Sequence, residues 1–420
     1  MTLPSQTLHS FDNGLRLLID PMPGLKTFAL SALVHGGARF ESEAQSGWAH
    51  LLEHMVFKGA AGRNARDLAE AIEHKGGAIN ASTGYEHTRF EVRGLNSLMP
   101  LALEIVTDLM FRSTLDAEEL EREKKVVEQE ILEAYDMPDD HVFDLLQGAM
   151  FAGQSLGRPI LGDKRSLKPA NRYNLRAFAE TLYAPRQVVI CVSGGVEARE
   201  VLATAKAAID HVPPHDGFAR PAEMCFTTGH RVQTRRIEQA NIAMAYQGLG
   251  RYSPDIIALR LFSEILGGGM ASRLFQEARE ARGLAYSIDA WATPYRDGGV
   301  FGLSAGCAPR DAAPLVELIR DVTADLAADP RESELERAKA QFMTSLFLNH
   351  EGAASRCGTF ASQVSTFGKV FTLDEVAAEI DRVTRDDLAR MGAMITGQKA
   401  CAAAMLGPKT MGDAQALFAA

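Results

Sequence analysis

Two histidines and a glutamate within five residues have the types and spacing of a metal-dependent hydrolytic site. The segment His50-Leu51-Leu52-Glu53-His54 places two imidazoles four residues apart, so on an α-helix they lie on one face and can bind one metal ion. Glu53 projects over the same face, where its carboxylate can take a proton from water. Two imidazoles and a carboxylate suit zinc. The motif alone also fits a solvent-exposed helix turn, so a third ligand is required.

A long, glutamate-rich helix predicted over residues 116–135 offers that ligand. Asp116 is a good N-cap, acidic residues fill the first turn, and Pro138 lies just beyond the end. Glu123 and Glu130 are two helical turns apart and share a face, whereas the other acids read as a solvated surface. The spacing alone does not choose between these two glutamates.

With these residues, the chain resembles the pitrilysin or insulinase class of zinc metallopeptidases, the inverzincins of peptidase family M16. The match is to the short bacterial and mitochondrial processing-peptidase type. In that family a glutamate ligand follows the motif by about 76 residues, and Glu130 follows His54 by 76. The resemblance implies that His50, His54 and Glu130 bind zinc and that Glu53 is the catalytic base. It also implies a supporting role for Glu123, seven residues before the ligand.

A glycine-initiated segment after the motif resembles the family strand beside the zinc, whose edge pairs with an extended substrate. Main-chain pairing of this kind binds many sequences. An ordinary strand, in which Asn80 is a structural hydrogen-bonding residue, is the alternative reading. The substrate-binding residues implied by the resemblance are Gly77, Ala78, Asn80 and Ala81.

Arg279 and Tyr286 match an arginine and tyrosine pair that the family keeps seven residues apart. The resemblance implies that they bind the substrate carbonyl and the developing oxyanion, for which both side chains are suitable donors. Without the resemblance, Arg279 reads as a surface charge and Tyr286 as a half-buried ring. The glycine triplet at 267–269 lacks the GxxxxGK[ST] spacing of a phosphate-binding loop.

An internal repeat predicts that the chain contains two copies of one fold. The tripeptide Leu-Glu-Arg at 120–122 recurs at 335–337, an offset of 215 residues, and a strand-like segment ending in glycine recurs at an offset of 213. Shifting the metal-site residues by 215 reaches positions that cannot bind zinc. These positions are Ile265, Gly268, Gly269 and Ser345.

The elements that must position these residues form an α+β protein of two homologous domains. Strands such as 28–34 and 187–192 alternate with amphipathic helices, and the resemblance implies a mainly antiparallel sheet packed with helices in each domain. We expect a zinc-binding catalytic domain at 1–212 and a proline-containing linker at 213–230. The second domain, 231–420, then lacks the metal motif and carries the Arg279 and Tyr286 pair.

Composition narrows the class of protein. The 420 residues are 46% hydrophobic and 23% charged, which fits two ordinary globular domains, and the net charge of −10 disfavours nucleic-acid binding. No presequence pattern or membrane-length apolar run is visible, so a cytoplasmic bacterial protein is expected. The five cysteines include no CxxC pair and read as reduced thiols.

These observations predict a zinc-dependent endopeptidase that cleaves extended or unfolded peptides. We expect it to act as a homodimer, or as a heterodimer with a related chain. The alternative is a non-catalytic structural or partner subunit of the same fold, because some relatives in the family have that role.

Overall fold

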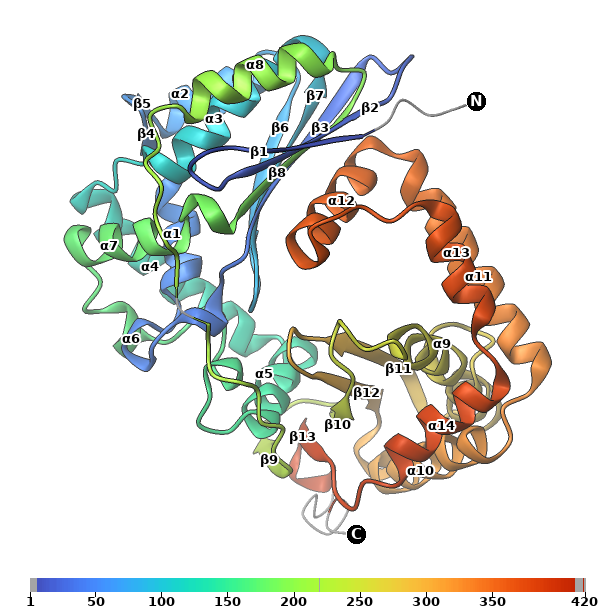
Figure 1. Cartoon of the computed structure of the whole chain (residues 1–420). Helices are drawn as coiled ribbons and strands as arrows, with labels where there is room; N and C mark the ends of the chain where they lie inside the picture. Colours follow the sequence, from blue (N-terminus) through green and yellow to red (C-terminus); the bar gives the residue numbers. More distant parts are fainter. Residues whose placement is uncertain (1–5, 219, 412–417, 419–420) are drawn as a thin grey trace. The chain divides into compact units, whose positions relative to one another are not determined.

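The computed structural model describes residues 6–218, 220–411 and 418 (Figure 1). The chain forms two compact units, and one division between them, after Pro221, falls inside the predicted linker. Each unit also takes a segment from the opposite half of the sequence. The compact units therefore have different boundaries from the domains 1–212 and 231–420 expected from the repeat. That division of the sequence stays a prediction. The first comprises Met1–Ile131, Pro159–Pro221 and Phe347–Phe371, and the second Leu132–Arg158, Ala222–Leu346 and Thr372–Ala420.

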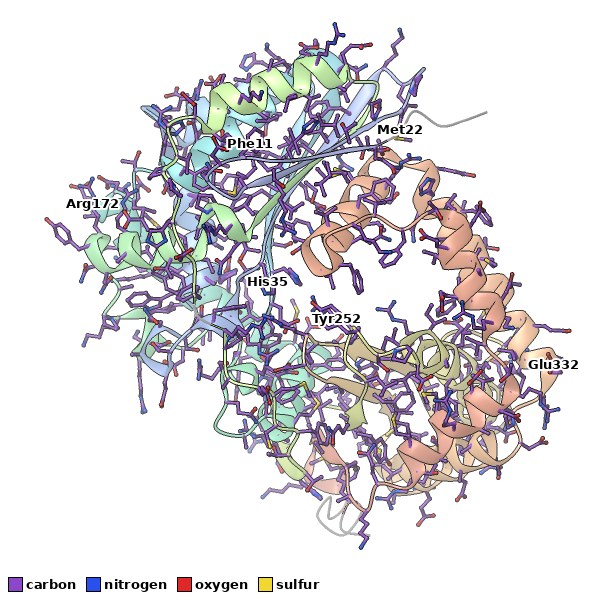
Figure 2. The ribbon with its side chains drawn as sticks, viewed as in Figure 1. Phe11, Met22, His35, Arg172, Tyr252 and Glu332 are labelled. Carbon is purple, nitrogen blue, oxygen red and sulfur yellow. The ribbon has the colours of Figure 1, made fainter. Side chains whose placement is uncertain are left out.

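A six-stranded, mainly antiparallel sheet forms the base of the first unit. Its order is β1-β2-β8-β3-β7-β6, in which β2 and β8 are parallel. Every residue of β8 is buried, as in a central strand, whereas β6 alternates between exposed and half-buried residues at the sheet edge. The strands are β1 (Thr7–Ser10), β2 (Arg16–Pro21), β3 (Thr27–Val34), β6 (Ala78–Thr83), β7 (Thr88–Leu95) and β8 (Val188–Gly194). Phe11 and Met22, which follow β1 and β2, are labelled in Figure 2.

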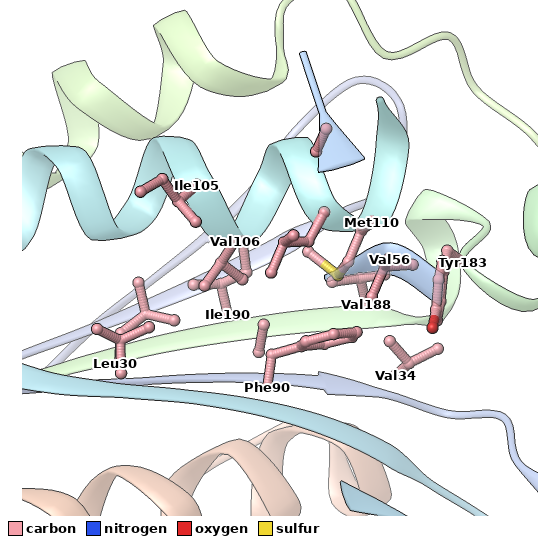
Figure 3. Packing of buried hydrophobic residues seen from close by; sticks show 14 of the residues in the cluster. Leu30, Val34, Val56, Phe90, Ile105, Val106, Met110, Tyr183, Val188 and Ile190 are labelled. Atoms are coloured by element: carbon pink, nitrogen blue, oxygen red, sulfur yellow. The ribbon is translucent and has the colours of Figure 1, made fainter. Parts of the chain in front are cut away.

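Helices cover one face of this sheet and enclose the main apolar core of the unit. In Figure 3, Leu30, Phe90 and Ile190 of the sheet pack with Val106 and Met110 of a helix. Burying each such side chain contributes about 1.5–3 kcal/mol. The helices are α1 (Trp48–Val56), α2 (Ala65–Glu73), α3 (Met99–Phe111), α6 (Lys164–Leu167), α7 (Arg172–Leu182) and α8 (Ala198–Ile209). A short hairpin, β4 (Gly59–Ala60) and β5 (Arg63–Asn64), follows α1, and α4 (Ala117–Asp136) begins in this unit.

The opposite face of the sheet is covered by α12 (Ala353–Phe367), which comes from the far end of the sequence. Cys357, Phe360 and Val364 pack on apolar residues of β2, β3 and β8. Arg356 binds Asp20 of β2 through two buried hydrogen bonds of 2.6 and 2.7 Å. Separating such a pair would leave an uncompensated buried charge. The helix is therefore an integral part of the first unit.

The second unit repeats the sheet of the first. Its strand order is β9-β13-β10-β12-β11. Strand by strand, this order corresponds to β2-β8-β3-β7-β6 of the first sheet. The strands β9 and β13 are adjacent and parallel, as β2 and β8 are in the first sheet. This shared order supports the two copies expected from the repeat. The strands are β9 (Gly229–Thr234), β10 (Ala240–Gly248), β11 (Ala285–Pro294), β12 (Gly299–Cys307) and β13 (Ala402–Gly407).

The helices of the second unit follow the same plan. An apolar cluster joins α9, α10 and α14 to the sheet, while α5, whose Val142 and Leu146 are buried, contacts β9, β10 and β13. A segment from the first half of the sequence therefore covers one face. The helices are α5 (Pro138–Met150), α9 (Ile256–Gly267), α10 (Ala312–Ala328), α13 (Leu373–Arg382) and α14 (Arg385–Thr396), and α11 (Glu332–Glu351) begins in this unit and ends in the first.

The predicted fold class is confirmed, because both units combine a mainly antiparallel sheet with packed helices. Among the described residues, no helix combines the length and the apolar character needed to cross a bilayer.

Candidate metal centre

The two motif histidines lie on the half-buried face of α1. Their rings are adjacent, with centroids 4.7 Å apart. The opposite face of the helix, which includes Trp48, Leu51 and Met55, is buried in the core and fixes the orientation of the helix. Hydrophobic periodicity therefore turns both imidazoles toward the same side.

The start of α1 is held by contacts that the motif does not reveal. Gly47 has φ +87° and packs so closely that a Cβ would lie 2.5 Å from the carbonyl oxygen of Leu161. The carboxylate of Glu41 accepts hydrogen bonds from the N–H groups of Gly47 (2.9 Å) and Ala49 (2.7 Å). A negative charge at the N-terminus of a helix is favourable. Trp48 donates from Nε1 to the carbonyl of Ser166 at 2.9 Å, which accommodates this bulky residue before the motif.

Glu130 of α4 faces both imidazoles. Its Oε2 atom lies 3.8 Å from Nε2 of His50 and 3.6 Å from Nε2 of His54. One donor atom from each of these three residues lies within 4.8 Å of the others, and this is the one such group of histidine, cysteine or acidic residues in the described part of the chain. Donor atoms around a tetrahedral zinc ion are about 3.3 Å apart, given zinc–nitrogen and zinc–oxygen distances near 2.0–2.2 Å. The donor set and spacing fit zinc.

Two buried atoms of this cluster lack hydrogen-bond partners. They are Oε2 of Glu130 and Nδ1 of His50. An unpaired buried carboxylate oxygen is costly, and a cation would satisfy it. Burial lowers the pKa of His50 to about 4, and the neighbouring His54 adds to this shift. His50 is therefore neutral near pH 7, which is the form that binds a metal.

Glu123 has a different position from Glu130, although both project from the same helix. Its Oε2 atom pairs with Nδ1 of His54 at 3.0 Å, and its Oε1 atom accepts from the ammonium group of Lys58 at 2.8 Å. With the proton of His54 assigned to Nδ1, the Nε2 lone pair points toward the Glu130 side. Glu123 therefore orients the imidazole and does not join the three-residue cluster.

Glu53 lies outside the cluster of donor atoms but next to it. Its Oε2 atom accepts a hydrogen bond from the hydroxyl of Thr83 at 2.5 Å. Burial raises the pKa of Glu53, the hydrogen bond from Thr83 and the charge of His54 oppose this shift, and Glu130 adds to it. A buried carboxylate with a raised pKa accepts protons more readily than an exposed one.

The predicted substrate strand is the free edge of the first sheet. β6 pairs with β7 on one side and ends the strand order on the other. Ala78 and Asn80 are exposed, whereas Ala81 packs against the core. A Cβ on Gly77 would lie 2.3 Å from a methyl carbon of Leu98, so a larger residue at this position would displace that side chain.

Arg279 and Tyr286 lie in the second unit. Arg279 belongs to the π-helical segment Phe275–Ala281, with its guanidinium carbon 4.8 Å from the ring centre of Phe275. Tyr286, near the start of β11, is 43% exposed and donates a hydrogen bond from its hydroxyl to Gln239. Burial raises its pKa, with contributions from Cys307 and Asp139. The remaining predicted site residues, from His50 to Glu130, belong to the first unit.

Sequence reasoning did not assign roles to three residues that support the site. Glu41 accepts hydrogen bonds at the start of α1. Lys58 pairs with Glu123, and Thr83 donates a hydrogen bond to Glu53. Their signals were weak. Lys58 lies beyond the end of α1, and Glu41 and Thr83 belong to other elements, so no helical spacing relates them to the motif.

Comparisons with known proteins found similar sequences over most of the chain. The sequence model of the insulinase family (peptidase family M16) matches residues 21–164, which contain the cluster, and the model described as the peptidase M16 inactive domain matches residues 169–342. A Bacillus subtilis (strain 168) protein named "Uncharacterized zinc protease YmxG" is 34% identical over 378 residues, covering 89% of this chain and 92% of that protein. The mitochondrial-processing peptidase subunit beta of Mus musculus is 31% identical over 420 residues, covering 97% and 86%.

A solved structure shares the fold. The crystal structure of a protease from Helicobacter pylori superposes with a TM-score of 0.91 at 22% identity, covering 97% of this chain and 100% of that one. At this level of identity, the similarity concerns the fold alone.

Proposed function

Because the chain belongs to peptidase family M16, the insulinase family of zinc proteases, we propose that it is a zinc-dependent endopeptidase acting on extended or unfolded peptides. One observation carries the proposal. Oε2 of Glu130, from α4, lies 3.8 Å from Nε2 of His50 and 3.6 Å from Nε2 of His54, both from α1, with Glu53 beside them. This arrangement has three protein ligands and a neighbouring base, as catalytic zinc sites do.

The residues of the first unit divide the catalytic work. Zinc held by His50, His54 and Glu130 would supply Lewis-acid chemistry that activates water and polarises a carbonyl. Glu53 accepts the proton of the attacking water and transfers it to the leaving amine nitrogen. The hydrogen bond from Thr83 holds the carboxylate of Glu53 in place, and burial raises the pKa of that carboxylate, which favours its acceptance of a proton.

Substrate recognition would use the main chain of β6. An extended peptide that pairs with this edge is held by backbone hydrogen bonds, which do not depend on its side chains. Folded proteins present few free extended segments, so the site favours unfolded or flexible peptides. Gly77, Ala78, Asn80 and Ala81 are the residues that we propose to line this contact.

A peptide digest tests the proposed activity. We expect the purified chain, with zinc, to cleave members of a random peptide library, and a chelator to abolish cleavage until zinc is restored. Mass spectrometry of the products gives activity, metal dependence and cleavage preference together. A metal-loaded chain that cleaves no peptide would contradict the proposal. It would favour the alternative of a non-catalytic structural or partner subunit.

We propose further that Arg279 and Tyr286 of one subunit complete the site of another in a dimer. They would donate hydrogen bonds to the developing oxyanion. In a mixed dimer of a Glu53→Gln chain and an Arg279→Ala chain, one site has both defects and the other has none. Purified mixed dimers should therefore regain about half of the parental rate per dimer, by the symmetry of a two-site assembly. Mixed dimers as inactive as either homodimer would exclude the shared site.

A further inference from the structure

The face of β6 and β7 that carries α12 has a different character from the face that carries the metal residues. Side chains alternate along a strand, so Ile79 and Ala81 pack toward the core and Thr83 reaches Glu53. Ala78 and Asn80 project to the other side. A peptide paired with β6 must alternate in the same way, and every second side chain then points away from the metal residues.

On that face, long charged residues of β7 lie next to short residues of β6, on the side away from the sheet edge. The register places Arg93 beside Ala78, Glu91 beside Asn80 and Arg89 beside Ser82. Because alanine, asparagine and serine are short, a side chain of a third strand added at the edge can reach over them.

A cavity of about 230 Å³ occupies this face, and residues of the edge strand β6 form part of its lining. It is too small for a drug-sized ligand but has room for one side chain. Its polar lining groups come from β3, β6 and β7, and Ala354 of α12 closes one side. These groups are Ser31, Asn80, Glu91 and Arg93.

One of these groups is available to a side chain at the sheet edge. Ser31 is 2% exposed and belongs to β3, which lies beyond β7 from that edge, so a side chain at the edge does not reach it. Arg93 is exposed, and no hydrogen bond or ion pair engages its guanidinium within the described residues. Glu91, by contrast, lies 3.6 Å from the guanidinium of Arg89, which also donates to Ser362. The one uncompensated charge beside the cavity is therefore positive.

From this geometry, and resting on the proposed function, we propose that the cavity is a specificity subsite for an acidic side chain of the bound peptide. The carboxylate of a glutamate or aspartate that faces Ala78 pairs with Arg93, which is the neighbour of Ala78 on β7. A lysine at the same position meets an unpaired positive charge. The preference applies to every second peptide position at most, because the intervening side chains face the metal residues.

The test uses a peptide whose cleavage site is known from the library digest. Glutamate, glutamine and lysine are placed in turn at each position around the scissile bond, and kcat/KM is measured for the zinc-loaded chain. We expect glutamate to be favoured over lysine at one position, or at positions two apart, and not at their immediate neighbours. Exposed charge pairs are individually weak, so a preference of about three- to fivefold is expected at low salt, and it should shrink as salt is added.

Charge reversal at Arg93 supplies the decisive comparison. Arg93→Glu should invert the preference and change the glutamate-to-lysine ratio by about tenfold, and Arg93→Gln should abolish it. Arg199→Glu is the matched control, because Arg199 is an exposed residue of α8, which packs on β2 at the other side of the sheet. It changes the net charge equally and should leave the ratio unchanged. Zinc content and melting temperature verify that each variant is folded.

The outcomes separate this inference from the proposed function. If the parent chain cleaves no peptide, the proposed function fails and the subsite fails with it. If the parent cleaves peptides but the glutamate-to-lysine ratio is the same in the parent and in Arg93→Glu at every position, the subsite alone is overturned. A ratio that moves equally in Arg199→Glu also overturns it, because the effect would then follow from net charge.

Discussion

Glu53→Gln is expected to keep the metal and to lose turnover by about 100- to 10,000-fold, the usual contribution of a general base. The amide has nearly the same size and shape as the carboxylate, and its oxygen can still accept the hydrogen bond from Thr83. It cannot accept the proton of the attacking water. The measurement is kcat/KM on a cleaved peptide, together with zinc content determined on the same preparation.

A matched control is available on the neighbouring helix α2. Glu70→Gln makes the same chemical change at an exposed position, and the predicted effect on both turnover and zinc is negligible. If Glu53→Gln emerged from purification without zinc while Glu70→Gln kept it, Glu53 would be a metal ligand, and the assigned roles would be wrong.

Glu130→Gln and Glu123→Gln should differ sharply in their effect on zinc. The first removes the anionic member of the three-donor cluster, so zinc binding should be lost or severely weakened and activity lost with it. The second leaves all three donor atoms in place but replaces the carboxylate that pairs with His54 and Lys58. Loss of such a supporting group weakens metal binding by about ten- to a hundredfold. Competition with a chromophoric chelator measures both affinities.

Metal-free stability distinguishes loss of a ligand from loss of the fold. The Oε2 atom of Glu130 has no hydrogen-bond partner without metal, so Glu130→Gln should unfold at the same temperature as the metal-free parent, or higher. Glu123→Gln should unfold at a lower temperature, because it removes a buried charge that has two partners. Equal zinc affinities for Glu130→Gln and the parent would reject Glu130 as a ligand. A weaker affinity in Glu123→Gln than in Glu130→Gln would exchange the two roles.

The sequence by itself determined the local geometry of the candidate site. Two histidines and a glutamate in the HxxEH order can share a face only on a helix, and the apolar residues between them dictate which side of that helix is buried. The repeat likewise predicted two similar sheets, and the shared strand order agrees with it. Periodicity and internal similarity are local properties of a chain, so they can be read without coordinates.

Helical spacing does not distinguish Glu123 from Glu130. The family resemblance implies which of them is the ligand, and only the tertiary structure shows the contacts that separate them. Both residues lie on the same face of α4, and the spacing of two turns treats them alike. Packing of α4 beside α1 places the Glu123 carboxylate at Nδ1 of His54 and the Glu130 carboxylate at Nε2 of both histidines. Which nitrogen of the His54 ring each glutamate approaches depends on how α1 and α4 pack against each other. The residue pattern within either helix does not contain that information.

The same reason explains the exchange of segments between the halves. α12 covers the first sheet through Arg356 and Asp20, which are 336 residues apart, and α5 covers the second sheet although it precedes all of its strands. An amphipathic helix shows that it has an apolar face, but not which sheet that face will cover. The free energy that decides between the sheets comes from burying that face and from pairing a buried charge. Those contacts exist only once distant parts of the chain have been brought together.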